Sequence, residues 1–234
     1  MDERNRRGHL PIWLAALVAL CVIWASFQFD EPVRQSVVQT QEKGWKKTDD
    51  YQFKTAVRRI GDWPWLMFAG AIGVAIAWKL KNRDWMRIIA AAMVASTLAG
   101  LIANTSRLTT GRTRPREGPE ISQGFYGPWN GRLTIGNPSY NSFPSGHTAT
   151  AFGFAGVIFF ARPWLGVGAL GLASLIAWSS IMIGAHHFSD VVAAICLSLF
   201  ISWYALRWTR EHGEAFARRV LRQLKARTAR HQAP

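Results

Sequence analysis

A histidine at the beginning of an apolar run marks the middle of the chain. Pro144, Ser145 and Gly146 precede His147, an order typical of a chain that is entering a helix. The free backbone N–H groups at a helix N-terminus bind anions, and phosphate above all. A histidine one turn inside can give or take a proton near neutral pH. The same residue could also serve as a structural cap, so this cluster does not define a site without its neighbours.

Two other clusters supply the residue types that phosphate chemistry would need. Arg107-Leu-Thr-Thr-Gly-Arg-Thr-Arg114-Pro115 offers guanidinium groups, which bind phosphate with paired hydrogen bonds. Ser179 to Asp190 contains His186, with the carboxylate of Asp190 four residues later. One histidine could attack phosphorus while the second protonates the departing oxygen, and the carboxylate could hold the nucleophile in the correct tautomer. Backbone N–H groups near Ser145 and Gly146 could stabilise the oxygens of the transition state.

The elements that must position these clusters are apolar helices. Nearly half of the 234 residues are apolar, and they gather in six blocks, at about 11–28, 63–80, 85–104, 145–161, 164–184 and 189–208. This pattern predicts an all-α, single-domain integral membrane protein, 1–234, with six transmembrane helices. The first block has no clean small-x-small cleavage pattern, which favours an uncleaved anchor. We expect an interfacial helical segment at 29–62, a long polar loop at 105–143 and a basic tail, helical at first, at 209–234.

The distribution of charge predicts the orientation. The formal charge is +14, and most of the basic residues flank the apolar blocks or lie in the tail. This favours retention of Lys and Arg on the cytoplasmic side over binding to nucleic acid. With both termini inside, segments 29–62, 105–143 and 185–188 lie outside, so all three polar clusters meet on the outer face. The arginines of 105–143 count against this orientation unless they have another role.

Metal chemistry is a poorer interpretation of the same residues. His186, His187 and Asp190 could ligate a metal ion. However, only His147 could join them, and the nearby arginines would repel a cation. His187 is better explained as a structural residue, and Cys21 and Cys196 as small apolar residues within their blocks. We therefore expect neither a metal nor another cofactor.

The three clusters resemble the signature motifs of the type 2 phosphatidic acid phosphatase family. Arg107 to Arg114-Pro115 resembles the first motif, with arginine in the place of the usual lysine, and Pro144 to His147 matches the second in full. Ser179, His186 and Asp190 have the spacing of the third. The resemblance implies that His186 is the nucleophile, that Asp190 orients it and that His147 is the acid for the leaving group. It also implies that Arg107, Arg114, Ser145 and Gly146 bind the phosphate.

The third motif departs from the family pattern at one position. Ser180 stands where the family has an arginine that contacts phosphate, and its place in the motif implies that Ser180 lies at the phosphate. Loss of that donor would cost roughly 2–4 kcal/mol of transition-state stabilisation, about two to three decades in rate. Three interpretations are open: an inactivating substitution, which we favour because the other motif residues are present; a natural variant compensated by another arginine such as Arg112; or a protein that binds lipid phosphate without turnover.

The sequence thus predicts a metal-independent membrane phosphatase that acts on a lipid phosphomonoester or diphosphate through a phosphohistidine. By resemblance, the substrates to consider are lipid A, phosphatidylglycerophosphate, phosphatidic acid and undecaprenyl diphosphate, in a bacterial inner membrane with a periplasmic site. Two alternatives are a lipid phosphotransferase and a non-catalytic lipid-phosphate-binding protein. The headgroup and the oligomeric state are left open by the sequence.

Overall fold

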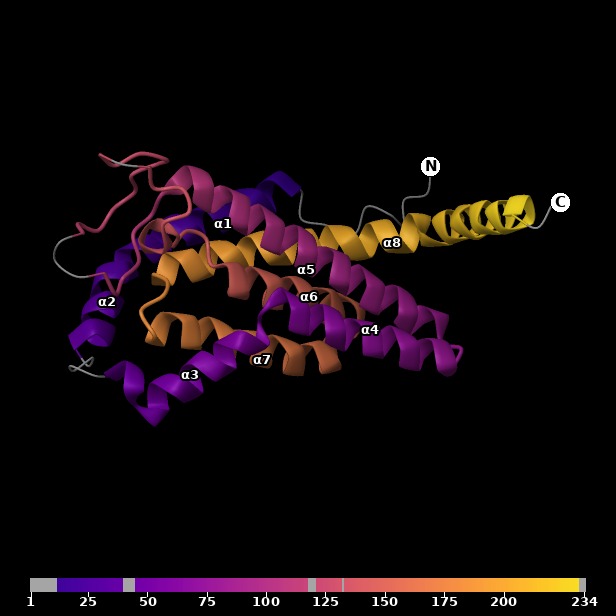
Figure 1. The fold of residues 1–234 in the computed structure, drawn as a ribbon, viewed down its shortest axis with the longest axis horizontal. Helices are drawn as coiled ribbons and strands as arrows, with labels where there is room; N and C mark the ends of the chain where they lie inside the picture. The colour runs from indigo at the N-terminus through magenta and orange to yellow at the C-terminus, as the bar shows by residue number, and fades with distance from the viewer. Residues whose placement is uncertain (1–11, 40–44, 118–120, 132, 232–234) are drawn as a thin grey trace.

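The computed structural model describes residues 12–39, 45–117, 121–131 and 133–231 (Figure 1). In these ranges the regular structure is helical, apart from two isolated β-bridges. The predicted all-α class is therefore confirmed. The α-helices are α1 (Ile12–Ser26), α2 (Asp30–Gln39), α3 (Asp49–Ile60), α4 (Trp63–Lys79), α5 (Arg83–Thr110), α6 (Gly146–Ala161), α7 (Pro163–Met182) and α8 (Phe188–His231).

The prediction of six spanning helices is met in part. Each apolar block forms a helix, but among the described residues four are long and apolar enough to cross a membrane: Ile12–Val37, α5, α7 and the Phe188–Gly213 part of α8. A fifth span results if α3 and α4, which bend by 52° at their junction, are taken together. Helix α6 has 16 residues. At 1.5 Å per residue that is roughly 24 Å, less than the ~30 Å of a bilayer core.

Several predicted boundaries were wrong by part of a helix. The first block does not end at residue 28, because the chain continues through a short 3₁₀ turn, Phe27–Phe29, into α2. Segment 29–62 is helical as expected, although 40–44 lie outside the described residues. Helix α5 runs on to Thr110, so Arg107 lies on a helix and the loop begins at Gly111. Helix α8 continues into the predicted tail as far as His231, whereas 1–10 and 232–234 are outside the described ranges.

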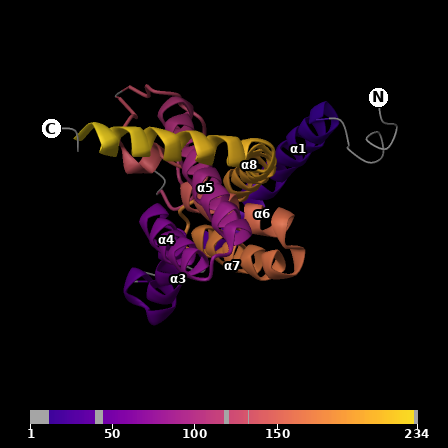
Figure 2. The ribbon, with the colours of Figure 1, turned by 90° about the vertical axis from the view of Figure 1, so that its right-hand side faces the viewer.

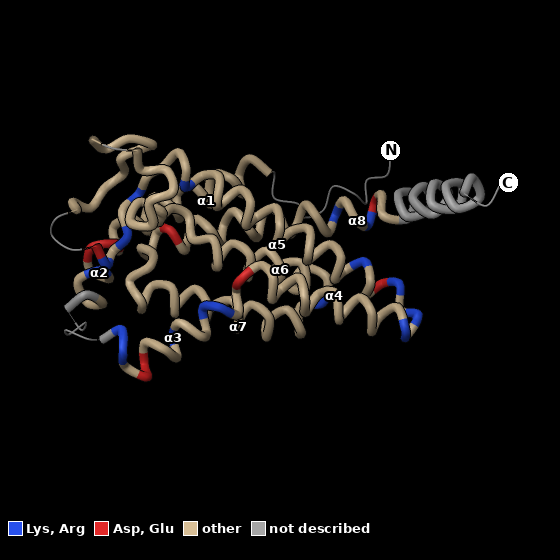
Figure 3. Tube along the Cα trace, in the orientation of Figure 1, with Lys and Arg blue, Asp and Glu red and all other residues tan. Residues whose placement is uncertain are grey.

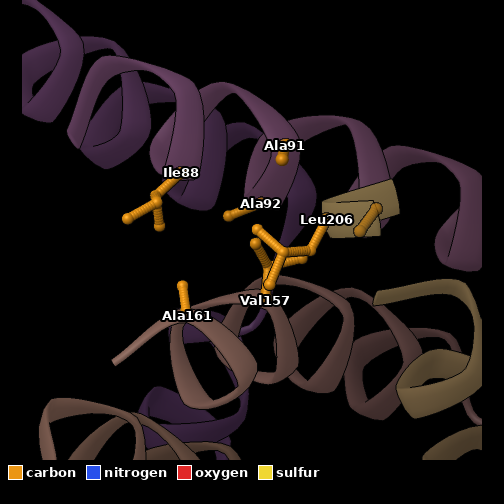
Figure 4. Close-up of a cluster of buried hydrophobic side chains, with 7 residues drawn as sticks. Ile88, Ala91, Ala92, Val157, Ala161 and Leu206 are labelled. Carbon is orange, nitrogen blue, oxygen red and sulfur yellow. The ribbon is translucent and has the colours of Figure 1, made fainter. Parts of the chain in front are cut away.

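Helix α6 lies inside the bundle, packed against α5, α7 and α8. Seen end-on, α1 and α3 lie at opposite margins of this group (Figure 2). A buried cluster joins α5, α6 and α8 through mostly small side chains (Figure 4): Ile88, Ala91, Ala92, Ala95, Val157, Ala161 and Leu206. Small residues let helices approach closely where no water is available to drive their association. This packing sets α6 at a fixed depth relative to its neighbours.

The outer surface of the bundle is apolar. Large apolar side chains such as Trp13, Leu20, Trp78 and Leu165 are more than half exposed. Lys, Arg, Asp and Glu lie mainly toward the two ends of the bundle and along α2 and α3 (Figure 3). An apolar flank between charged ends is what a lipid bilayer requires of a helical protein.

Candidate active site

The three polar clusters meet at one end of the bundle. The C-terminal end of α5, the N-terminal end of α6 and the turn between α7 and α8 all lie there (Figure 1). The clusters are joined by direct hydrogen bonds: Arg107 Nε donates to Pro144 O at 2.9 Å, and Ser145 N donates to Asp190 O at 3.1 Å. The expectation that topology brings the clusters together therefore agrees with the structure.

The guanidinium of Arg107 lies over the N-terminus of α6. A Cβ on Gly146 would lie 2.8 Å from Arg107 Nη2, so glycine leaves the space that this side chain uses. Ser145 is the N-cap residue, but its hydroxyl pairs with Thr148 Oγ1 at 2.9 Å and makes no cap hydrogen bond. A positive group and a helix N-terminus thus point into the same place, which favours an anion there.

His186 is held in the tautomer that a nucleophile needs. Its Nδ1 lies 2.8 Å from the carbonyl oxygen of Ser142, so Nδ1 carries the hydrogen and Nε2 carries the lone pair. Burial lowers the pKa of His186 to about 3, despite the opposing effect of Asp190, and the ring is neutral at pH 7. The sequence predicted that Asp190 orients this ring, and its Oδ2 lies 3.7 Å from Nδ1. The shorter contact of Nδ1 is with the backbone carbonyl of Ser142, so both groups stand on the Nδ1 side of the ring.

Asp190 is the centre of a buried ionic network. Its carboxylate accepts hydrogen bonds from Arg112 at 2.5 Å, from Ser142 Oγ at 2.5 Å and from the backbone N–H of His187 at 2.7 Å. Arg112 also pairs with Asp30 at 2.5 Å. Asp190 therefore fixes the loop and the turn on either side of His186, and so helps to hold that side chain in place.

Arg112 is committed to this network. Besides its two carboxylate partners, its guanidinium lies over the rings of Phe27, Phe125 and Phe143, 4.6 to 5.9 Å from their centroids. The side chain is buried. The structure thus gives Arg112 a positioning role, in contrast to the sequence-based suggestion that it compensates for Ser180.

Several buried nitrogens at this end have no hydrogen-bond partner. Within the described residues they include Arg107 Nη2, Arg114 Nε and His186 Nε2. Burial, followed by the nearby charges of Arg116, Arg58 and Arg107, lowers the pKa of Arg114 to about 10. Unpaired buried donors are costly, and their gathering here suits a ligand that brings several acceptor oxygens.

His147 has an acidic partner that the sequence did not indicate. Its Nε2 lies 2.5 Å from Oδ1 of Asp62, which is the N-cap residue of α4. The one signal in the sequence was an acidic residue directly before the apolar block that begins at Trp63. His187 is structural, as expected, with Nε2 3.0 Å from the carbonyl oxygen of Thr113.

Ser180 offers the site no donor. It is fully buried, and its hydroxyl donates to the carbonyl of Ile176 in its own helix at 3.0 Å. Ser179 does the same at 2.8 Å. Ser180 was predicted to contact phosphate because of its place in the third motif. It does lie beside His186, whose backbone N–H donates to the carbonyl oxygen of Ser180 at 3.3 Å, but its hydroxyl is directed to Ile176.

An apolar helix bundle that brings a buried histidine, two arginines and a helix N-terminus together at one end has the features that a membrane phosphatase requires. The model of the PAP2 superfamily matches residues 85–214, more than half of the chain. The chain therefore belongs to the PAP2 superfamily, which confirms the resemblance to type 2 phosphatidic acid phosphatases. It is a multi-pass membrane protein of the lipid phosphatase branch.

Its relatives include proteins named lipid A 1-phosphatase. That of Rhizobium johnstonii is 26% identical over 225 residues, covering 88% of this chain and 85% of the relative. That of Rhizobium etli is 30% identical over 108 residues, covering 46% and 43%.

Two crystal structures share the fold. A PAP2-type phosphatidylglycerolphosphate phosphatase from Bacillus subtilis superposes with a TM-score of 0.54 at 18% identity, covering 84% of this chain and 94% of the other. LpxE of Aquifex aeolicus gives 0.52 at 18% identity, covering 76% and 95%.

Proposed function

We propose that this protein hydrolyses a lipid phosphate without a metal, through a phosphohistidine on His186. The observation that carries the proposal is the group of buried, unpartnered nitrogens on Arg107, Arg114 and His186 beside the N-terminus of α6. A phosphate group would supply acceptor oxygens to the arginines and a phosphorus atom to Nε2.

The reaction has two steps. Nε2 of His186 attacks phosphorus, the bond from phosphorus to the lipid oxygen breaks, and His147 gives a proton to that oxygen. A water molecule then attacks the phosphohistidine, His147 takes its proton, and the bond from phosphorus to Nε2 breaks to release inorganic phosphate. Arg107, Arg114 and the N–H group of Gly146 hold the phosphoryl oxygens in both steps, while the N–H group of Ser145 stays bonded to the carbonyl oxygen of Asp190.

Lipid A is the leading candidate substrate. The relatives named lipid A 1-phosphatase support the 1-phosphate of lipid A as the group that is removed. One of these relatives aligns with most of this chain. Phosphatidic acid, phosphatidylglycerophosphate and undecaprenyl diphosphate belong on the same panel because their phosphates present the same oxygens.

We further propose that the whole chain forms one domain of six spans in a bacterial inner membrane. Helix α4 would complete a span with α3, and α6 would cross with its N-terminus below the membrane surface. Both termini would be cytoplasmic and the active site periplasmic. The basic residues between α4 and α5 and in the first part of the tail support this orientation.

The test is phosphate release from the four lipids by the purified protein in detergent. We expect release from at least one lipid, loss of turnover in His186→Ala and full activity in His212→Ala, which removes an exposed histidine of α8. Turnover that survives in His186→Ala would refute the mechanism. Phosphorylated lipid acceptor with little free phosphate would instead identify a phosphotransferase, and tight binding without turnover a lipid-phosphate-binding protein.

A further inference from the structure

The third motif leaves the site without one of its positive groups. Ser179 and Ser180 both turn their hydroxyls back to the carbonyl oxygen of Ile176. Helix α7 therefore brings no cation to the phosphate-binding end of the bundle. If the protein turns over a lipid phosphate, another element must supply that charge.

Helix α3 lies against this part of α7. The two helices are in contact, and the ammonium of Lys54 lies 5.7 Å from the centroid of the Trp178 ring. At the end of α3, a Cβ on Gly61 would lie 2.7 Å from Cγ2 of Ile176. Ile176 is the residue that accepts the Ser180 hydroxyl, so the end of α3 reaches α7 within one turn of Ser180.

The same turn is fixed to the start of α6. Thr150 Oγ1 donates to Gly61 O at 2.6 Å, and a Cβ on Gly61 would lie 3.1 Å from the carbonyl oxygen of His147. Asp62, the next residue, touches His147 at 2.5 Å. The last turn of α3 thus lies between the N-terminal end of α6 and the C-terminal part of α7. Arg58 belongs to that turn.

Arg58 has the environment of a phosphate-binding arginine. Its Nε is buried and has no hydrogen-bond partner in the described structure, as is the case for Arg107 Nη2 and Arg114 Nε. Its charge acts on both catalytic histidines and on both motif arginines. Next to burial, it is among the groups that lower the pKa of Arg114 and of His186. Its neighbour Arg59, by contrast, is exposed.

We propose that Arg58 binds the phosphate and takes the place of the arginine that Ser180 does not provide. The inference rests on the proposed phosphatase function and assigns to that site a residue from outside the three motifs. A guanidinium stabilises the phosphoryl oxygens through its position and its paired donors, whichever helix carries it. The site is then complete, and Ser180 is a natural residue of a working enzyme.

The experiment compares Arg58→Ala with Arg59→Ala, a matched loss of one arginine from the same turn. We expect Arg58→Ala to lower kcat/KM by about 10²–10³-fold, the usual effect of losing one oxyanion donor. Arg59→Ala should stay within about two-fold of the wild type. Arg58→Lys keeps the positive charge and the aliphatic part of the side chain but lacks the guanidinium group. It tests the role of the paired donors if the alanine variant does not fold. Its kcat/KM should fall about ten-fold because lysine cannot form the paired hydrogen bonds.

Ser180→Arg tests the replacement itself. In the wild type it should bring no gain, because Arg58 already supplies the charge. In Arg58→Ala it should restore at least about ten-fold of the lost kcat/KM. A ten-fold gain from Ser180→Arg alone, or no recovery in the double variant, would overturn the replacement. Activity of Arg58→Ala within about two-fold of wild type, or an equal loss in Arg59→Ala, would overturn phosphate binding by Arg58.

Orthovanadate separates this inference from the proposed function. It mimics the five-coordinate phosphorus, and its binding can be measured by calorimetry without knowledge of the lipid. We expect Arg58→Ala to weaken vanadate binding about ten-fold or more, and Arg59→Ala to leave it unchanged. The wild type could be active and His186→Ala inactive while vanadate binding is unchanged in Arg58→Ala. That result would refute phosphate binding by Arg58 and leave the proposed function standing. A wild type that neither turns over the lipid panel nor binds vanadate would refute both proposals.

Discussion

Replacing Asp62 with asparagine tests whether this carboxylate supports the protonated form of His147. The carboxylate lies 2.5 Å from Nε2, while burial first, and then the charges of Arg58, Arg107 and Arg114, disfavour a positive charge on the ring. If Asp62 offsets part of this effect, Nε2–H of the protonated ring would point to Asp62 and Nδ1–H would be the proton for the leaving oxygen. Asparagine keeps the shape of the side chain and removes its charge. A smaller fraction of His147 would then be protonated before the reaction.

The size of the effect follows from the exposure of the pair. A hydrogen bond to a charged group is worth about 1.5–3 kcal/mol when it is buried. The Asp62 side chain is 37% exposed and that of His147 is 22% exposed. Solvent screening reduces the contribution to about 1–2 kcal/mol. We therefore expect kcat to fall about 5- to 30-fold for a lipid with an alcohol leaving group.

The assay compares two kinds of leaving group. Phosphatidic acid needs a proton on the departing oxygen, whereas p-nitrophenyl phosphate leaves as a stable phenolate. Asp62→Asn should slow the first much more than the second, and should move the alkaline limb of kcat/KM to lower pH. Asp50→Asn, which removes the exposed partner of Lys54 on α3, is the control. Equal slowing of both substrates, or an unchanged alkaline limb, would refute the role of Asp62.

Three other predictions concern stability, each measured by thermal unfolding in detergent. Arg112→Ala should cost about 3–5 kcal/mol, because it leaves two buried carboxylates unpaired, while loss of the more exposed Arg34 ion pair should cost less than about 1 kcal/mol; similar losses in the two variants would contradict the network. The lowered pKa of His186 means that the unfolded chain takes up its proton first, so stability should fall as pH drops below about 6.5, and less so in His186→Asn; equal pH profiles would argue against the shift. Gly153→Ala should destabilise by about 1–3 kcal/mol, because its Cβ would lie 2.9 Å from the carbonyl oxygen of Ala95, whereas Gly168→Ala meets nothing within 4 Å and should be tolerated; equal effects would contradict the close packing of α5 on α6.

The motifs predicted which residues meet because they lie at helix ends whose order along the chain fixes their side of the bundle. Arg107, His147 and His186 each begin or end an apolar block, so six alternating helices bring them together. The same reasoning predicted the helical class and the approximate ranges of the blocks. It missed helix ends, since α5 continues for six residues of polar sequence after Asn104 and α6 has only 16 residues.

Contacts between distant segments could not be predicted in this way. Asp30, Arg58 and Asp62 lie in a segment that composition alone described as interfacial, and no spacing rule relates them to the motifs. Their roles depend on how α2 and α3 lean on the bundle, which is decided by packing at positions such as Gly61. The hydrogen-bond partner of His186 Nδ1 is a backbone carbonyl. Every residue has one, so the residue type at that position does not reveal it.

The arginines between α5 and α6 were the main objection to a periplasmic site, because outer segments should be poor in basic residues. The structure gives Arg112 and Arg114 other roles, whereas Arg132 lies outside the described residues. Arg112 is neutralised by Asp30 and Asp190, and Nε of Arg114 is buried at the candidate phosphate site. The backbone N–H of Arg116 donates to Gly184 O at 3.2 Å, which fixes that residue against the turn that carries His186. Charges held inside the fold do not act as solvated loop charges in setting orientation. Orientation then depends on the basic residues at the opposite end of the bundle, where α4 ends and α5 begins. Four lie there, Lys79, Lys81, Arg83 and Arg87, and they favour a cytoplasmic location for that end.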